Sequence, residues 1–146
     1  GKTKPEELGG SHFNLVNGIT GGAVPQVNTT ENLANYKALN TAIKAGLVRS
    51  CHDLSEGGLA VAAAEMAFAG GIGVKLNENL TAADLFAESN GRFLVEVEPC
   101  KGKEFEAKVS CVQIGDTNNG SQLVAGTSIS SPLDELKSAW QQPLRQ

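Results

Sequence analysis

Long apolar runs and aromatic residues are scarce in this sequence. Aromatic residues make up 5% of its 146 residues, and the longest apolar run covers residues 59–64 before Glu65 interrupts it. Such a run is far too short to cross a membrane, and the opening GKTKPEELGG lacks the apolar centre of a signal peptide. We therefore expect a chain that neither spans a membrane nor carries a secretion signal.

Cysteines are few and poorly spaced for a metal site. Cys51, Cys100 and Cys111 are odd in number and form no CxxC pair, and their spacing to His12 and His52 does not match a zinc site. Disulfides persist mainly in oxidising compartments, so this pattern favours a reducing, cytoplasmic location. We expect no metal ligand in this chain.

Basic clusters and the common nucleotide motifs are also missing. The net charge is −4 and no Lys/Arg cluster occurs, which argues against nucleic-acid binding. The sequence has no GxxxxGK(S/T) phosphate loop and no GxSxG nucleophile elbow, and GGIGVK lacks the third glycine of GxGxxG. No familiar hydrolase or dinucleotide site is therefore expected.

The sequence does contain an alternation of helix and strand patterns. With 40% hydrophobic and 19% charged residues, it is typical of a soluble globular domain. We expect one domain over residues 1–146, with an α/β (α+β) layered fold whose mixed β-sheet is flanked by helices. The expected strands cover residues 47–52, 72–76, 92–97, 111–115 and 121–126. The expected helices begin near residue 11, cover about 31–46 and 57–69, include 84–89 and 101–109, and resume at 132.

Caps and turns mark the ends of these elements. The N-cap candidates are Ser11, Thr30, Thr81 in a capping box with Asp84, and Ser131 with Pro132 at the first helical position. Residues 118–120, Asn-Asn-Gly, predict a hairpin between the last two strands. Leu33, Tyr36, Ile43 and Leu47 recur at helical spacing in the second helix.

The helix expected over residues 57–69 is apolar on all sides except at Glu65. A helix of this kind is usually buried all round. We expect it either to be central in this domain or to be covered by another domain. Glu65 is either a buried partner for a cation or an exposed edge residue.

The stretch HDLSEGGL, between a strand and this helix, is the main candidate for chemistry. Ser55 can cap the helix by accepting a hydrogen bond from an N–H group near Gly58. Gly57 and Gly58 allow close approach of a ligand to backbone N–H groups, and the positive end of the helix favours an anion such as phosphate. A plain capped helix start explains the same residues. Glu56 opposes a bare anion unless Mg²⁺ lies between them.

Three further groups of polar residues accompany HDLSEGGL. His52 and Asp53 are either an acid/base pair or a structural pair, since neighbouring side chains on a strand diverge. Residues 9–11, Gly-Gly-Ser, form a second glycine-rich turn that could offer backbone donors or be a plain turn. In ESNGR, residues 90–91 are a natural left-handed helix stop, and Arg92 is expected to face solvent.

The order of these motifs resembles a known family. ELGGS, LVRSCHDLSEGGLAVAAAEMAFAGGIGV, LFAESNGRFLVEV and PLDELKSAWQQPL follow one another. In this they are similar to the C-terminal region of the large subunit of the phosphoribosylformylglycinamidine synthases, within the superfamily of aminoimidazole ribonucleotide synthase. HDLSEGGLA is the most specific element, and the resemblance covers nearly the whole chain.

The resemblance implies an ATP- and Mg²⁺-dependent step of purine biosynthesis. In this family, ATP phosphorylates the formyl amide oxygen of formylglycinamide ribonucleotide. Ammonia from a glutaminase subunit or domain then displaces the phosphate to give formylglycinamidine ribonucleotide, ADP and phosphate. The implied partners are the glutaminase and the remaining domains of the same large subunit. We expect the nucleotide-binding N-terminal domains to be absent here and the chain to be inactive alone.

The resemblance also assigns residues, none of them catalytic. It implies a phosphate- or nucleotide-facing surface made of Ser55, Glu56, Gly57, Gly58, Gly9, Gly10 and Ser11. The supporting residues are His52, Asp53, Glu88, Ser89, Asn90 and Arg92. Residues 88–90 stand where the first C-terminal domain of the family has a substrate-contacting Glu-Ser-Gln, but the third residue here is Asn. Two alternatives stay open: a packing domain without ligand contacts, or the corresponding domain of aminoimidazole ribonucleotide synthase or a related kinase.

Overall fold

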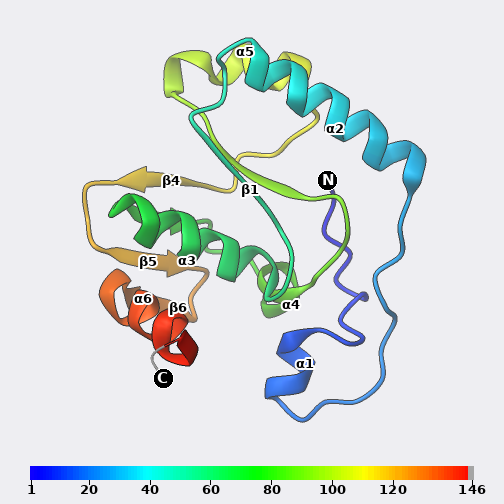
Figure 1. Cartoon of the computed structure of the whole chain (residues 1–146), viewed down its shortest axis with the longest axis vertical. Coiled ribbons are helices and arrows are strands. Elements are labelled where there is room, and N and C mark those ends of the chain that lie inside the picture. The colour runs from blue at the N-terminus through cyan, green and yellow to red at the C-terminus, as the bar shows by residue number, and fades with distance from the viewer. Residues whose placement is uncertain (145–146) are drawn as a thin grey trace.

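The computed structural model describes residues 1–144, in which helices and strands are interspersed along the chain (Figure 1). The helices are α1 (His12–Val16), α2 (Thr29–Lys44), α3 (Gly58–Gly70), α4 (Ala82–Phe86), α5 (Gly102–Lys108) and α6 (Leu133–Gln141). Short 3₁₀ turns, η1 (Pro99–Lys101) and η2 (Gln142–Leu144), precede α5 and follow α6. The strands are β1 (Ser50–Asp53), β2 (Gly73–Leu76), β3 (Phe93–Glu96), β4 (Gly115–Asn118), β5 (Gln122–Ala125) and β6 (Ile129–Pro132).

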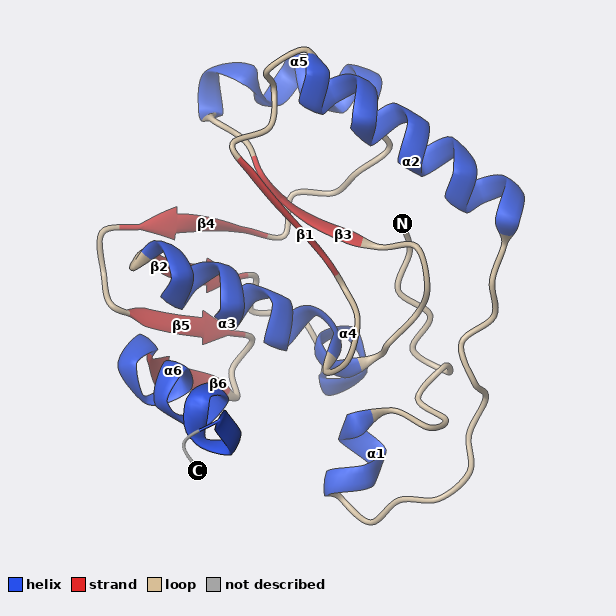
Figure 2. Cartoon of the chain, viewed as in Figure 1, coloured by secondary structure: helices blue, strands red, loops and turns tan. Residues whose placement is uncertain are grey.

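These strands form two separate sheets (Figure 2). β1 and β3 make an antiparallel ribbon in which Ser50 lies opposite Glu96. The second sheet has the order β4-β2-β5-β6 and is mixed, because β2 and β5 are parallel while the other neighbours are antiparallel. The expected α/β fold with a mixed sheet flanked by helices is thus confirmed.

Each sheet has its own apolar core. Helices α2 and α5 cover the β1–β3 ribbon, with Leu39, Leu47 and Phe105 buried between them. The larger core lies between α3, α4, α6 and the four-stranded sheet, and includes Leu59 and Leu85. No helix of residues 1–144 is long and apolar enough to cross a membrane.

Helix α3 occupies the centre of the larger core, as Figures 1 and 2 show. Most of its residues are buried, and it contacts α4, α6 and strands of both sheets. The expectation that this all-apolar helix is central is therefore confirmed within this chain. The helix ends at Gly70, and Gly71, which has a left-handed backbone, is its C-cap.

Two of the expected helix starts are confirmed by their hydrogen bonds. The Ser11 side chain accepts from the Asn14 N–H at the start of α1. Thr81 and Asp84 exchange side-chain-to-backbone bonds at the start of α4 and form a complete capping box. Both patterns are local in sequence, which is why the residues alone were sufficient to predict them.

Two other helix starts were placed wrongly. Helix α2 begins at Thr29, and Asn28 rather than Thr30 is its N-cap, because the Asn28 side chain accepts from the Glu31 N–H. Helix α6 has Pro132 as its N-cap, and no side chain caps it. Ser131 belongs instead to β6.

The hairpin expected at residues 118–120 is also wrong. Strands β4 and β5 are consecutive but do not pair, because β2 lies between them. The connection crosses the end of β2, where Gly73 leaves no space for a side chain next to Gly120. The apolar pattern over residues 31–47 also misled in part: Leu33, Tyr36 and Ile43 are exposed, and only Leu47 of the four is buried.

Candidate functional site

The HDLSEGGL stretch forms the turn between β1 and α3, and its glycines start the helix. Gly57 is the N-cap with a left-handed backbone (φ +78°), and Gly58 follows in the same region (φ +63°). Ser55 does not cap α3 with its side chain, contrary to expectation; its carbonyl oxygen accepts from the Gly58 N–H at 3.1 Å. The turn is closed by backbone, so the exposed Ser55 and Glu56 side chains stay at the surface.

The two glycines are required by close packing within the protein. A Cβ on Gly58 would lie 2.5 Å from the Ala87 carbonyl oxygen, and one on Gly57 would overlap the Val61 side chain. Both glycines are buried. The start of α3 therefore packs directly on the backbone that follows α4, and the glycines serve this contact whether or not a ligand binds nearby.

Glu88 joins the two glycine-rich turns. One carboxylate oxygen, Oε1, accepts the Gly57 N–H at 2.8 Å and the His12 N–H at 2.9 Å. Its side chain is 16% exposed. The Gly57 N–H, one of the backbone donors expected to face an anion, thus points at an internal carboxylate, which has the charge that the positive helix end favours. The sequence suggested Glu88 only as a supporting residue.

The ELGGS turn is likewise held by hydrogen bonds within the chain. Gly9 donates its N–H to the Ala23 carbonyl at 2.8 Å, and Gly10 has a left-handed backbone (φ +76°). The Ser11 hydroxyl is buried, donates to the Leu8 carbonyl at 2.7 Å and caps α1. Of the residues in this turn, Gly10 is the one that lies exposed at the surface.

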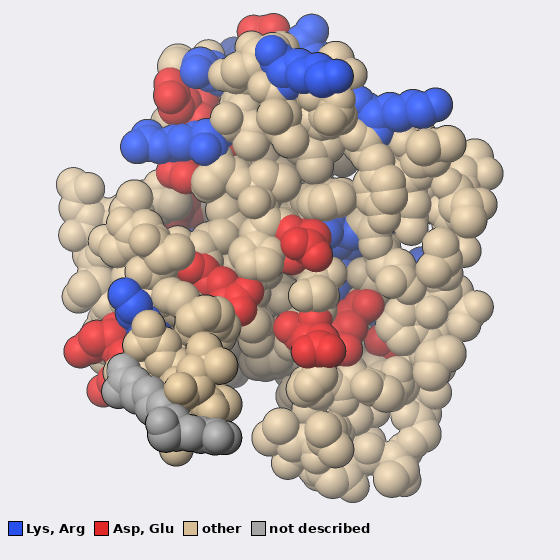
Figure 3. Space-filling model, viewed as in Figure 1, with Lys and Arg blue, Asp and Glu red and all other residues tan. Residues whose placement is uncertain are grey.

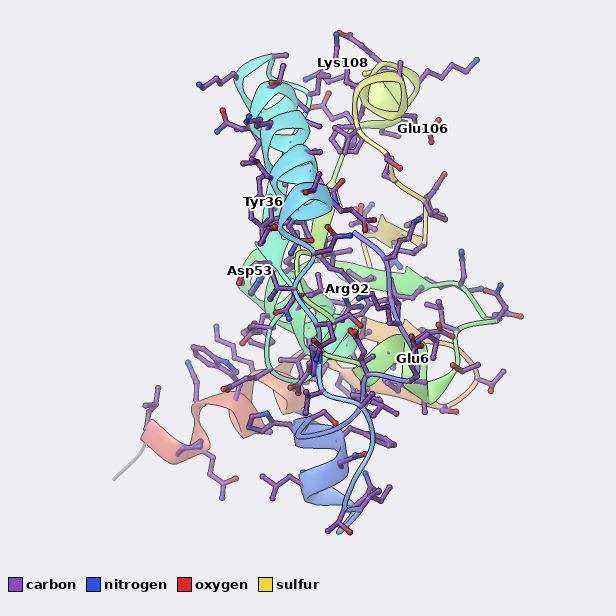
Figure 4. The ribbon with its side chains drawn as sticks, turned by 90° about the vertical axis from the view of Figure 1, so that its right-hand side faces the viewer. Glu6, Tyr36, Asp53, Arg92, Glu106 and Lys108 are labelled. Atoms are coloured by element: carbon purple, nitrogen blue, oxygen red, sulfur yellow. The ribbon has the colours of Figure 1, made fainter. Side chains whose placement is uncertain are left out.

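In the ESNGR stretch, Arg92 is buried, although it was expected to face solvent. It is 4% exposed, donating from Nε to the Ser89 carbonyl and from Nη1 to Thr3 Oγ1, both at 3.0 Å; Nη2 donates to the Ala87 carbonyl. Figure 4 shows Arg92 inside the molecule, near the N-terminal segment. Burial lowers the pKa of Arg92, and the nearby Glu7 and Glu88 oppose this shift.

Other residues of this stretch lie nearby. The Ser89 hydroxyl is fully buried and accepts the Lys4 N–H at 3.0 Å. Asn90 is exposed, and Gly91 has the left-handed backbone (φ +75°) that the sequence indicated. The N-terminal segment is therefore attached to the 87–92 loop by hydrogen bonds from both sides.

His52 is held by Glu65 rather than by the Asp53 carboxylate. Its Nδ1 lies 2.7 Å from the Asp53 backbone oxygen, and its Nε2 lies 2.8 Å from Glu65 Oε2. The Asp53 carboxylate is 3.6 Å from Nδ1 and largely exposed. The other Glu65 oxygen accepts the Trp140 indole N–H at 2.8 Å. Sequence reasoning missed these partners, although the one charged residue in an apolar helix signalled a special role.

Negative charge surrounds the start of α3. Asp53 and Glu56 are largely exposed there, next to the partly buried Glu65 and Glu88. In Figure 3 acidic side chains gather near the middle of the face, whereas basic ones gather over α2 and α5. Within residues 1–144, no three His, Cys, Asp or Glu side chains converge as ligands for a metal ion.

A cleft of about 1570 Å³ adjoins this region and is lined by residues of β1, β2, β3, β4 and α3. Of the residues predicted to bind phosphate or nucleotide, only Ser55 lines it, together with His52, Glu65 and Arg92. The structure thus connects the two glycine-rich turns through Glu88, but Ser55 is the one residue of these turns that lines the cleft.

Comparison with known proteins gives a consistent family and fold. The family described as "AIR synthase related protein, C-terminal domain" matches residues 2–126. Solved structures with this fold include Thermotoga maritima PurL complexed with FGAR, at 17% identity and a TM-score of 0.69 over 78% of this chain and 22% of that chain. T. maritima PurL complexed with ATP matches at 17% identity and 0.63, over 70% and 21%.

A third structure, phosphoribosylformylglycinamidine synthase II from Thermotoga maritima, matches at 16% identity with a TM-score of 0.68, over 78% of this chain and 22% of that one. The chain thus spans little more than a fifth of the length of these proteins. At this level of identity, the matches establish the fold of the chain.

Proposed function

Because this chain belongs to the family of AIR synthase related C-terminal domains, we propose that it is one domain of a cytoplasmic, ATP-dependent synthase of purine biosynthesis. The whole enzyme would convert formylglycinamide ribonucleotide, ATP and ammonia from a glutaminase partner to formylglycinamidine ribonucleotide, ADP and phosphate. The proposal is supported by related folds solved with FGAR and with ATP. The chain alone would be inactive, since no catalytic residue is assigned to it.

The observation that carries the proposal is the bridge between the two glycine-rich turns. Glu88 holds the starts of α1 and α3 to the same carboxylate oxygen, so residues 9–11 and 55–58 lie next to each other. In our proposal, this paired surface faces the phosphate groups of a nucleotide held mainly by the other domains. Ser55, Glu56 and Gly10 are its exposed members.

The charge of this surface restricts how a nucleotide could approach it. Glu56 is 81% exposed at the side chain, and Glu88 approaches the same His12 ring, so a bare phosphate would be repelled by both carboxylates. Since no three potential ligands converge among the described residues, the side chains of this chain do not by themselves make a Mg²⁺ site. Any ion accompanying the nucleotide would take its protein ligands from other domains.

An assay with purified parts tests the proposal. The chain alone should show no ATP- and ammonia-dependent amidine formation, and activity should appear when the N-terminal domains of the enzyme are added. In the reconstituted protein, ADP with Mg²⁺ should shift backbone amide signals at residues 9–11 and 55–58. Turnover by the chain alone would contradict the proposal, as would a reconstituted, active enzyme in which these signals do not respond to nucleotide.

One observation favours a second candidate, a packing domain without ligand contacts. The Gly57 and His12 N–H groups already have an internal acceptor, and the glycines are needed for packing. This alternative predicts that reconstitution restores activity while the amides of both turns remain unaffected by ADP, phosphate or substrate. The same titration therefore decides between the two.

A further inference from the structure

Among residues 1–144, the Glu88 carboxylate is the side chain whose hydrogen bonds connect the start of α1 with the start of α3. Its Oε1 accepts from the first residue of α1 and from the N-cap of α3, at 2.9 and 2.8 Å. We propose that Glu88 is a positioning residue: it fixes the two glycine-rich turns relative to each other, so that they present one ligand-facing surface. The ligand-facing role of this surface rests on the proposed function, whereas the experiment that tests the position of Glu88 does not depend on it.

The backbone that carries Glu88 is fixed from both sides. Ala87 and Ser89 are fully buried. The Arg92 guanidinium donates to both of their carbonyl groups, and Ser89 Oγ accepts from the Lys4 N–H. Because the backbone on either side of Glu88 is held in place, its carboxylate accepts the His12 and Gly57 N–H groups from a fixed position. Glu88 can therefore fix the positions of both turns relative to the 87–92 loop.

The His12 imidazole adds a weaker connection beside the first. Its Nδ1 lies 3.5 Å from Glu88 Oε1, and its Nε2 lies 3.9 Å from Glu56 Oε2. When protonated, the ring would be attracted to both carboxylates, that of Glu56 in the HDLSEGGL turn and that of Glu88 in the 87–92 loop. It is 50% exposed, so solvent weakens both interactions. We therefore assign the positioning role to Glu88 and only a minor contribution to His12.

A charged acceptor shared by two N–H groups should leave a signature that ordinary packing does not. In the Glu88→Ala variant, the His12 and Gly57 amides should exchange with water about tenfold faster or more, and together, because both lose the same charged acceptor. Glu88→Gln keeps the shape and a neutral acceptor, so a smaller acceleration of both amides is expected. Glu6→Gln, at an exposed position, is the matched control.

Amide exchange measured by NMR on the full chain provides the test, with amides inside α3 as an internal reference for global stability. The expected result is joint acceleration at His12 and Gly57 with an unchanged reference. Adding formate to Glu88→Ala should then restore part of the protection at both amides, since a small carboxylate can occupy the vacated position. Acceleration of only one amide, or no rescue by formate, would overturn the proposal.

The amide-exchange result for Glu88 can be distinguished from the result of the nucleotide titration that tests the proposed function. Exchange at His12 and Gly57 needs no nucleotide, so the positioning role can hold even if ADP never binds. If nucleotide does bind to the reconstituted enzyme, Glu88→Gln should raise the KM for ATP several-fold with an unchanged melting temperature. A fall in melting temperature without a change in KM would assign Glu88 to stability alone and overturn its role in the site.

Discussion

His52 on β1 and Glu65 on α3 form a direct contact, with His52 Nε2 2.8 Å from Glu65 Oε2. The other Glu65 oxygen accepts the Trp140 indole N–H from α6, at the same distance. The Trp140 ring also packs against Phe68, with centroids 5.6 Å apart. One carboxylate thus connects the strand that leads into the HDLSEGGL turn with the C-terminal helix, through the central helix of the fold.

Replacing Glu65 should loosen both connections. Glu65→Ala removes the shared acceptor of His52 and Trp140, and we expect it to lower the free energy of unfolding by about 1–3 kcal/mol. Because the chain has a single tryptophan, its fluorescence reports on α6 directly, and the emission should shift to longer wavelength. Urea unfolding followed by this fluorescence measures both effects. Lys137→Ala, at an exposed position on α6, should change neither; an equal effect there would refute the assignment.

The role of Glu65 shows what the sequence could and could not predict about the site. One carboxylate in an apolar helix indicated a buried partner or an edge position, but its two partners come from β1 and α6, and only the tertiary fold brings them together. The Glu88 bridge was hidden for the same reason. Sequence reasoning singled out the HDLSEGGL, ELGGS and ESNGR segments but missed the side-chain contacts that connect them.

Two glycine-to-alanine substitutions distinguish a glycine that close packing requires from a glycine with space for a side chain. Gly58→Ala should destabilise the chain by about 2 kcal/mol or more, because the position needs φ +63° and the new Cβ would lie 2.5 Å from the Ala87 carbonyl oxygen. Gly102→Ala, in α5, meets no atom within 4 Å and should instead stabilise by about 0.4–1 kcal/mol. Denaturant unfolding of both variants measures the contrast. Similar values for the two would contradict the packing argument.

Prediction of the fold succeeded where the signal was local and failed where it was not. The Thr81–Asp84 capping box and the Ser11 cap each lie within four consecutive residues, and both are confirmed. The insertion of β2 between β4 and β5 depends on pairings between distant segments, and a turn-like Asn-Asn-Gly gives no information about them. Strand order therefore follows from pairing between distant segments, here the pairing of β2 with both β4 and β5.

The capping box of α4 should contribute measurably to stability. Thr81→Ala removes the acceptor of the Asp84 N–H and should cost about 1 kcal/mol. The hydrogen bond from the Thr81 hydroxyl, followed by the one from its N–H, lowers the pKa of Asp84. That pKa should therefore rise in the variant, which NMR titration of the Asp84 carboxyl can follow. Thr20→Ala, in an exposed loop, should leave both quantities unchanged.

Stability should fall in acid through Glu7, the buried first residue of the ELGGS turn. Burial by itself raises the pKa of Glu7, but hydrogen bonds from the Gln26 N–H and the Lys4 ammonium, each 3.1 Å from Oε1, outweigh it and leave the pKa below its ordinary value of 4.5. A carboxyl whose pKa is lower in the folded state stabilises the fold above its unfolded pKa. That contribution disappears as the pH falls through the folded value.

Glu7→Gln should consequently be less stable than the natural chain at pH 7, by about 1–3 kcal/mol, because a neutral amide is the weaker acceptor. The difference should shrink as the pH falls below about 4.5, since the natural chain then loses the same charge. Urea unfolding at several pH values between 7 and 3 measures both parts. Glu6→Gln, at the neighbouring exposed position, should show a small difference at every pH. A Glu7→Gln difference that stays constant down to pH 3 would mean that Glu7 acts through its shape and not through its charge.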